Sequence, residues 1–317
     1  MADAPPHRPR GLGPHVVGQR IVVRRVLPGE TGPSGGPAMT DVLGVCTAWS
    51  EDECVVVRED GSSVRIALAH VVSGKPVPPR PSVRQRVSPR DVQRHVESLW
   101  DDLVAEPLGE WVLRAAPPYD GRLRRRGNSV LAMGSPGLPL GEAVERVRRF
   151  YRRHNRPALA QVQSGGDVDA DLRGLGWQPL GSGDAHCQLA AVSRALRSCT
   201  AELSRLPRES ARPEGAMTPR YLEEGGRLEV VLGDGTARGR AALDTDWVGL
   251  HSIEVDPARR RRGLATVVLA ELLDWAASHG ATTAWLHVET DNPGAIALYE
   301  RHGFVTHHTS RYLTAPE

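Results

Sequence analysis

The stretch IEVDPARRRRGLAT at residues 253–266 consists of three segments of different composition. It begins as a strand-like apolar run, passes through Pro257 into four successive arginines, and continues after Gly263 as a small, apolar, helix-like segment. A glycine at such a junction lets the backbone bend close to a ligand, and the start of the helix offers free amides and the positive end of its dipole. Neither GxxxxGK[ST] nor GxGxxG occurs here, so a Walker loop and a dinucleotide fingerprint are excluded. We expect a strand–turn–helix unit that binds a pyrophosphate.

The residues around this stretch predict an α/β arrangement. A hairpin turning at Asp234-Gly235 precedes it, and alternating strand-like runs end in turns while the helix-like runs close at glycines. The order is therefore strand, loop, helix, strand, helix around a sheet. The predicted elements are a strand at 247–255, a helix at 263–280, a strand at 283–289 and a helix at 292–304.

Three segments together closely resemble the Gcn5-related N-acetyltransferase (GNAT) superfamily: IEVDPARRRRGLAT, WLHVETDN (285–292) and NPGAIALYERHGF (292–304). The first is similar to the family's pyrophosphate motif R/Q-x-x-G-x-G/A, and the last fills every fixed position of N-x-x-A-x-x-L-Y-x-x-x-G-F. The resemblance covers the chain from Gly225 onward. It implies direct transfer of an acetyl group from acetyl-CoA to a primary amine of a protein or small molecule, in a ternary complex.

The resemblance also implies where acetyl-CoA binds. In this family the strand before the pyrophosphate loop parts from its neighbour, and pantetheine fills the gap like an added strand. Asn292 would cap the last helix and contact the cofactor arm. Tyr299, two helical turns further on the same face, would contact the cofactor and protonate the departing thiolate. The backbone groups expected to bind the cofactor belong to Ile253, Glu254, Val255, Arg261, Arg262, Gly263, Leu264, Ala265 and Thr266.

The base that accepts the proton of the amine has three candidates. His287 stands on the second parted strand, where some family members place a glutamate, and strand alternation puts it on one face with Trp285 and Glu289. His251 on the preceding strand could point into the same cleft. Glu254 is the third candidate, although its place at the presumed bulge leaves its direction open.

The rest of the chain predicts further domains. Short strand-like runs with tight turns and no helix indicate a small SH3-like β-barrel, followed by a proline-rich linker. The part after the linker has the element order of a second GNAT-like half, but its turn GSPGLPLGE (134–142) lacks arginine, so we expect a degenerate repeat without its own acetyl-CoA. The predicted parts are a disordered tail at 1–14, the barrel at 15–73, the linker at 74–88, the degenerate half at 89–195, a connector at 196–216 and the catalytic half at 217–317.

Composition excludes several classes of function. The 317 residues carry a formal net charge of +2, so no general nucleic-acid or membrane role is forced, and we expect neither partner. The arginine run RLRRR (122–126) is expected to be a solvated loop. The cysteines have no zinc-ligand spacing, so no metal is expected and a reducing cytoplasm is the predicted location. They are Cys46, Cys54, Cys187 and Cys199.

Two functions therefore remain. The first is the acetyl-CoA-dependent N-acetyltransferase. The second is a non-catalytic acyl-CoA sensor or scaffold that recruits a partner through the SH3-like part. The presence of Asn292 and Tyr299 favours the enzyme, because a sensor needs a pyrophosphate loop but no acid for a thiolate. No sequence feature identifies the amine acceptor or the oligomeric state.

Overall fold

The computed structural model describes residues 12–32, 35–58, 60–77, 82–118, 121–205 and 218–316. The chain divides into two compact units, residues 1–81 (unit 1) and residues 82–317 (unit 2). The two halves predicted from the sequence as separate domains, 89–195 and 217–317, belong to the same unit because both contribute strands to one sheet.

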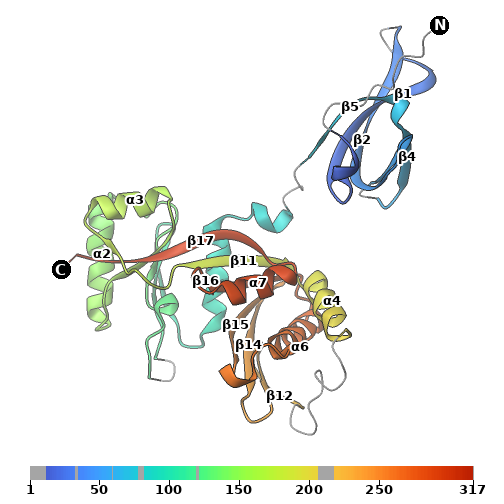
Figure 1. Cartoon of the computed structure of the whole chain (residues 1–317). Helices are drawn as coiled ribbons and strands as arrows, with labels where there is room; N and C mark the ends of the chain where they lie inside the picture. Colours follow the sequence, from blue (N-terminus) through green and yellow to red (C-terminus); the bar gives the residue numbers. More distant parts are fainter. Residues whose placement is uncertain are drawn as a thin grey trace. The chain divides into compact units, whose positions relative to one another are not determined.

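Unit 1 is an antiparallel sheet with the strand order β4-β3-β2-β1-β5, drawn in blue in Figure 1. Alternate residues of its strands fill a core, in which Ile21 and Val23 pack with Val56 and Ile66. Strands β3 and β4 pair as a hairpin on either side of Asp60-Gly61. The strands are β1 (Arg20–Thr31), β2 (Pro37–Trp49), β3 (Glu53–Val57), β4 (Ser63–Ala67) and β5 (Val71–Pro76).

The two edge strands of this sheet, β4 and β5, do not pair with each other, so the described residues of unit 1 form no closed barrel. An SH3-like identity for unit 1 stays a prediction. Most of the tail expected at 1–14 lies outside the described residues, but Leu12 packs in the core of the sheet. Most of the linker expected at 74–88 is short extended or turn structure, and its residues 78–81 lie outside the described part.

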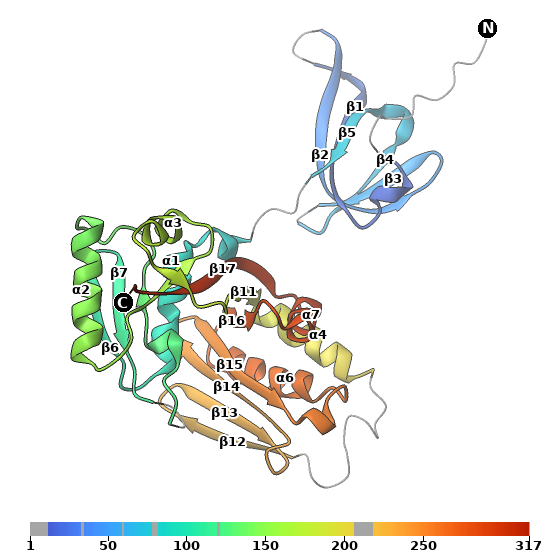
Figure 2. The same ribbon diagram turned by 60° about the vertical axis from the view of Figure 1, so that its left-hand side comes forward.

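One continuous sheet organises unit 2, in the order β12-β13-β14-β15-β16-β11-β17-β9-β8-β7-β6, with β10 paired to β17 (Figure 2). The strands of the first half are β6 (Val104–Leu108), β7 (Trp111–Ala115), β8 (Val130–Leu131), β9 (Leu159–Gln163), β10 (Gln178–Pro179) and β11 (Ala185–Ala191). Those of the second half are β12 (Pro219–Glu224), β13 (Arg227–Leu232), β14 (Ala237–Asp244), β15 (Trp247–Val255), β16 (Thr283–Glu289) and β17 (Val305–Thr314).

The two halves repeat one order of elements and exchange their last strands. The first half runs β8, α2 (Leu140–Arg153), β9, α3 (Asp167–Gly174) and β11. The second runs β15, α6 (Leu264–Ser278), β16, α7 (Pro293–Arg301) and β17. The pairs β8–β9 and β15–β16 are parallel. Strand β11 then pairs with β16 of the other half, β17 pairs with β9, and β11 and β17 pair with each other at the centre.

A short helical segment lies against the centre of the sheet, on the face away from α6. It comprises α1 (Pro89–Arg94) and the 3-10 turn η4 (His95–Leu99), whose Val92 and Val96 pack with Trp285. Ser88 caps α1, because its hydroxyl accepts a hydrogen bond from the amide of Asp91. The helical segment ends at Leu99, and the chain then turns into the edge strand β6.

Helix α4 (Val192–Leu203) fills the first part of the connector expected at 196–216, and residues 206–217 lie outside the described part. Val192, Ala195 and Cys199 are buried at helical spacing, which is the signal that identifies this helix. None of the helices that the structure describes is long and apolar enough to cross a membrane.

Candidate active site

The turn between β15 and α6 presents a row of backbone amides. Arg261 and Gly263 both have left-handed backbone angles, with φ of 63° and 77°. The amide of Val267 is the first to bond back along the helix, to the Gly263 carbonyl at 3.0 Å. Within the described residues, no hydrogen bond uses the amides of residues 261–266. Such a run of unpaired N–H groups at a helix start is a ready site for an anion.

Side chains around this turn hold it in shape. The Asp256 carboxylate accepts from the Ala258 amide at 2.8 Å and fixes the 3-10 turn η6 (Pro257–Arg259). Thr266 turns its hydroxyl inward to the Glu202 carboxylate of α4 at 3.0 Å, which leaves only its amide facing outward. Arg261 and Arg262 are exposed and form no ion pair with any described residue. The turn therefore fits a pyrophosphate, with backbone donors beneath it and guanidinium groups at its mouth.

Strands β15 and β16 part next to this turn. Their parallel pairing runs from Trp247 and Thr283 to Leu250 and Leu286 and goes no further. Just beyond, Ser252 has a left-handed φ of 52° where the β14–β15 register shifts, so the strand bulges. The end of β15 consequently has one edge without a strand partner. An extended chain of amide groups, such as pantetheine, can bond to that edge.

The backbone groups at the parted edge come from alternate residues. The Asp256 amide donates to the Thr236 carbonyl, in line with β14, at 2.9 Å. In an antiparallel pair, alternate residues direct their N–H and C=O groups to opposite sides. Ile253 and Val255 therefore direct theirs into the gap, whereas those of Glu254 point to β14. The backbone groups of Ile253 and Val255 can therefore contact the cofactor as expected, whereas those of Glu254 cannot.

Helix α7 carries the expected cap and the expected phenol. Asn292 Oδ1 accepts from the Ala295 amide at 3.1 Å and caps the helix. The Tyr299 ring is buried against Phe304, with a centroid separation of 5.8 Å. Burial raises the pKa of Tyr299 to about 12, so the phenol keeps its proton at neutral pH. Its hydroxyl forms no hydrogen bond with a described residue and is not sealed from solvent.

A cleft of about 1270 Å³ lies between the two halves of unit 2, on the face of the sheet away from α6. His251 and His287 line it from the two parted strands, as the strand alternation predicts. The run 122–126, expected to be a solvated loop, contributes Arg124, Arg125 and Arg126 to its wall. The loop is drawn inward because Arg125 donates to the Ser182 carbonyl at 2.9 Å.

A buried chain of hydrogen bonds begins at a backbone carbonyl beneath the cleft. His307 Nε2 lies 2.9 Å from the Val87 carbonyl, which can only accept, so this nitrogen carries the proton. His307 Nδ1 then accepts from His308 Nδ1 at 2.7 Å. His308 Nε2 in turn accepts from the Gln93 amide nitrogen at 2.8 Å. Burial lowers the pKa of His307, and lowers that of His308 to about 3, so both rings are neutral as this chain requires.

A second chain fixes the amide of Gln93 from the other side. Arg114 can only donate, and it donates to Gln161 Oε1 at 2.7 Å; the Gln161 amide nitrogen donates to Gln93 Oε1 at 3.0 Å. The Gln93 nitrogen therefore faces the histidines and lies 2.8 Å from His287 Nε2, closer than its oxygen at 3.1 Å. His287 Nε2 must accept this bond, which leaves the proton on Nδ1. Burial, and then Arg126, holds the pKa of His287 well below its usual value.

The two other candidates for the base differ in their surroundings. His251 bonds through Nδ1 to the Ser252 hydroxyl at 3.2 Å, and its Nε2 has no bond to a described residue. Burial lowers the pKa of His251 to about 3, with Arg126 and Arg240 as the next causes. Glu254 is exposed, does not line the cleft, and forms an ion pair with Arg238 at 2.7 Å. Of the three, only His251 lines the cleft and has a ring nitrogen that is both unbonded to a described residue and open to solvent, because the unbonded Nδ1 of His287 is sealed from solvent.

Several site residues escape sequence reasoning. Gln93 comes from a helix ahead of both halves, and nothing in its local pattern links it to His287. Glu229 and Arg240 line the cleft as an ion pair of 2.9 Å across β13 and β14, which hairpin pairing could have suggested. In the described part of the chain, no three His, Cys, Asp or Glu side chains gather to hold a metal ion.

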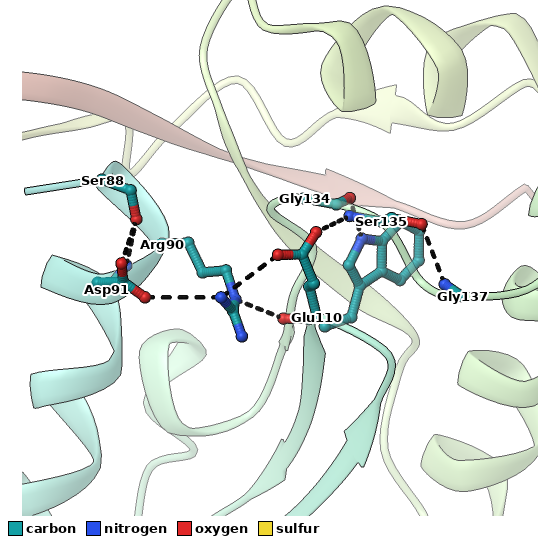
Figure 3. A network of polar contacts seen from close by, with 8 residues as sticks. Ser88, Arg90, Asp91, Glu110, Gly134, Ser135 and Gly137 are labelled. Carbon is teal, nitrogen blue, oxygen red and sulfur yellow. Dashed lines mark hydrogen bonds and ion pairs between the residues drawn. The ribbon is translucent and has the colours of Figure 1, made fainter.

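The first half fills the equivalent of the anion-binding turn with its own carboxylate (Figure 3). This turn, between β8 and α2, contains Ser135, whose amide donates to Glu110 Oε2 at 2.6 Å. The Arg90 guanidinium lies 3.4 Å from the other oxygen of Glu110, and the indole N–H of Trp111 donates to the Gly134 carbonyl at 2.9 Å. Gly137 donates to the Ser135 hydroxyl at 3.2 Å. A carboxylate of the chain thus accepts a hydrogen bond from an amide of this turn.

We expect acetyl-CoA to bind with one site per chain, because the side chain of Glu110 already accepts a hydrogen bond from the Ser135 amide in the turn of the first half. Isothermal titration calorimetry of the full chain measures this stoichiometry. Glu110→Gln should leave it at one, since the amide can still accept from Ser135. Two equivalent sites in the unmodified protein would contradict the interpretation of the first half as degenerate.

The fold and the parted strands define the class of protein that unit 2 resembles, the Gcn5-related N-acetyltransferases. Unit 2 is similar to a GCN5-related N-acetyltransferase from Kribbella flavida, with a TM-score of 0.51, 15% identity, and coverage of 72% of this chain and 95% of that one. Residues 219–313 match the family described as "Probable histone acetyltransferase Rv0428c C-terminal".

Two sequence relatives carry N-acetyltransferase names. The "Uncharacterized N-acetyltransferase YobR" of Bacillus subtilis is 24% identical over 240 residues, which cover 68% of this chain and 94% of the relative. The "[Ribosomal protein bS18]-alanine N-acetyltransferase" of Salmonella typhimurium is 46% identical over 59 residues, which cover 19% of this chain and 40% of that enzyme. Together the comparisons support a GNAT-like fold and a relationship with acetyltransferases of this type.

Proposed function

We propose that this protein is an N-acetyltransferase that moves an acetyl group from acetyl-CoA to a primary amine. The observation that carries the proposal is the unpaired amide row at 261–266 beside a pair of strands that parts at Leu250 and Leu286. The amides of residues 261–266 would hold the pyrophosphate. The open edge at Ile253 and Val255 would hold the pantetheine arm. When bound, acetyl-CoA supplies an activated thioester carbonyl and a thiolate leaving group.

The acid and the base of this reaction would work from opposite faces of the sheet. Tyr299 packs in the core that contains α6, whereas His251 faces the cleft. The amine enters from the cleft and attacks through the gap between the strands. Its nitrogen becomes positively charged as the new bond forms, which makes its proton acidic enough for a weak base. His251 Nε2 would accept that proton, and the Tyr299 hydroxyl would donate one to the leaving sulfur.

His287 has a different part in this proposal. Its Nε2 is committed to Gln93, so it has no free lone pair for the amine. Its Nδ1 is sealed from solvent and has no partner among the described residues. A neutral ring held in one tautomer keeps the wall of the gap fixed and uncharged beside the thioester. We therefore propose that His287 orients the gap and that His251 relays the proton.

Release of CoA thiol tests the proposed function directly. Purified full-length protein is incubated with acetyl-CoA and a panel of primary amines: amino acids, polyamines, lysine peptides and peptides with free N-termini. We expect amine-dependent thiol release matched by an acetylated product in mass spectrometry. Tight acetyl-CoA binding without thiol release for any amine would favour the sensor or scaffold instead.

We expect His251→Asn to lower kcat about 100-fold, the lower end of the usual range for general base catalysis. Because the pKa of His251 is about 3, the ring stays unprotonated from pH 5 to 9, and the unmodified enzyme should show no break near the ordinary histidine pKa. The loss should be greatest at low pH, where hydroxide is too scarce to replace His251 as the base. The pH–rate profile of an acceptor found in the panel measures both effects.

His279→Asn is the matched control, since His279 is exposed at the end of α6 and does not line the cleft. It should keep the rate and the pH profile of the unmodified enzyme. A His251→Asn protein with an unchanged profile would leave His251 without a role in proton transfer.

A further inference from the structure

Arg126 differs from the other arginines of the cleft because it has no hydrogen-bond or ion-pair partner among the residues that the structure describes. Arg125 donates to Ser182, Arg227 pairs with Asp101, and Arg240 pairs with Glu229. Arg124 also has a partner. Arg126 makes no hydrogen bond or ion pair with any described residue, and its Nε is shielded from solvent. Arg126 is half-buried in the wall of the cleft, and a guanidinium without a partner among the described residues can bind an anion that a ligand supplies.

The guanidinium of Arg126 lies close to the reacting end of the cleft. After burial, it is the strongest influence that lowers the pKa of His251 and of His287, the two histidines of the parted strands. Burial raises the pKa of Cys187, the register partner of His287 on β11, and Arg126 opposes that rise. Because Arg126 lines the same cleft as His251 and His287, an anion bound to it would lie in the cleft that the amine enters.

The rim of the cleft carries the opposite charge. Its exposed carboxylates form no ion pair within the described residues, and they belong to Asp102, Glu224, Glu289 and Asp291. Such a rim attracts a cation during encounter, but solvent screens it and it does not fix orientation. A ligand that matches both features has a positive end, the protonated amine, and a negative group that reaches the unpaired guanidinium.

We propose that Arg126 binds an anionic group of the acceptor, so that the preferred acceptors are amines that also carry a carboxylate a few bonds from the nitrogen. The inference rests on the proposed transferase function and adds the chemical class of its acceptor. The planar guanidinium fork suits the two oxygens of a carboxylate. Binding there orients the amine toward the gap between β15 and β16.

Matched pairs of small amines test the proposal: β-alanine with β-alaninamide, and 4-aminobutyrate with 4-aminobutyramide. Each pair differs only in the charge of the second group, and thiol-release rates are referred to the neutral fraction of the amine. We expect kcat/KM to be about 10- to 100-fold higher for the carboxylate member, as for one charge-assisted hydrogen-bond pair. 2-Aminoethyl phosphate distinguishes a carboxylate site from a general anion site.

Arg126→Gln should abolish this preference through a higher KM for the carboxylates, without lowering the rates with the amides or the affinity for acetyl-CoA. Arg126→Lys keeps the charge and should retain part of the preference. Arg122→Gln is the control, because Arg122 is an exposed arginine of the same loop that does not line the cleft. An equal preference in the unmodified and Arg126→Gln proteins, or faster reaction of the amides, would overturn the proposal.

Calorimetry separates this inference from the proposed function. 4-Aminobutyrate is titrated into the full chain saturated with CoA, which cannot react, and the titration is repeated with Arg126→Gln. If 4-aminobutyrate binds only when Arg126 is present but no amine of the panel is acetylated, the anion site is supported and the transferase function is contradicted. If amines are acetylated equally with and without Arg126, the transferase function is supported and the anion site is contradicted. Neither binding nor transfer would contradict both.

Discussion

Gly263→Glu should abolish measurable binding of acetyl-CoA while unit 2 remains folded. Gly263 adopts a left-handed φ of 77° at the N-terminus of α6, a conformation that costs any other residue about 1–2 kcal/mol. The new side chain would also bring a carboxylate to the amide row that holds the phosphates. Repulsion between these anions at a helix start, together with the altered turn, should weaken binding more than 100-fold, or about 2.7 kcal/mol. Calorimetry with acetyl-CoA measures the loss.

Gly280→Glu provides the control for backbone strain. Gly280 follows the other end of α6, has a φ of 83°, and has open space around it. The same substitution there carries a similar strain and the same charge, but it lies far from the amide row. It should lower the thermal stability and leave acetyl-CoA affinity intact. Unchanged affinity for acetyl-CoA in a folded Gly263→Glu protein would contradict the proposal that residues 261–266 bind the phosphates.

Tyr299→Phe should lower kcat about 10²- to 10⁴-fold with little change in the affinity for acetyl-CoA. The substitution removes one oxygen, and the ring still packs against Phe304 in the core. The pKa of Tyr299 is about 12, so the phenol is protonated across the working range and can act as an acid without prior titration. Single-turnover kinetics separate the chemical step from product release, and calorimetry measures affinity.

The matched control is Tyr221→Phe. Tyr221 is exposed on β12, and its hydroxyl donates to the Glu271 carboxylate of α6 at 2.7 Å. Loss of that oxygen should leave kcat unchanged. A Tyr299→Phe protein with a loss below about tenfold would mean that solvent protonates the thiolate or that another step limits the rate.

The sequence predicts those parts of the site that depend on neighbours along the chain. Gly263 precedes a run of helix-forming residues, and Asn292 precedes Pro293, so each helix start can be read from a few adjacent positions. Strand alternation likewise places His251 and His287 on the cleft face. The direction of the backbone groups of Glu254 depends on the bulge at Ser252, and no local sequence pattern predicts that bulge.

The unpredicted parts depend on contacts between distant positions. Gln93 and His287 are 194 positions apart, and their hydrogen bond decides which ring nitrogen can accept a proton. Arg126 lines a cleft only because the first half of unit 2 packs beside the second. Periodicity and turn signals carry no information on such pairings, so an arginine-rich loop at 122–126 looks like solvated surface until the fold is known.

The exchange of β11 and β17 has a consequence for how unit 2 folds and for how it can be divided. Gln161 and Ser310, which bond at the centre, are 149 positions apart. Central contacts of such high contact order are slow to form, because the entropy of closing long loops must be overcome first. Neither half alone can cover the edge of its own sheet: without β11, strand β16 would present an unpaired edge, a template for aggregation. We therefore expect that the second half, proposed to bind acetyl-CoA, does not fold as an isolated domain without the first half.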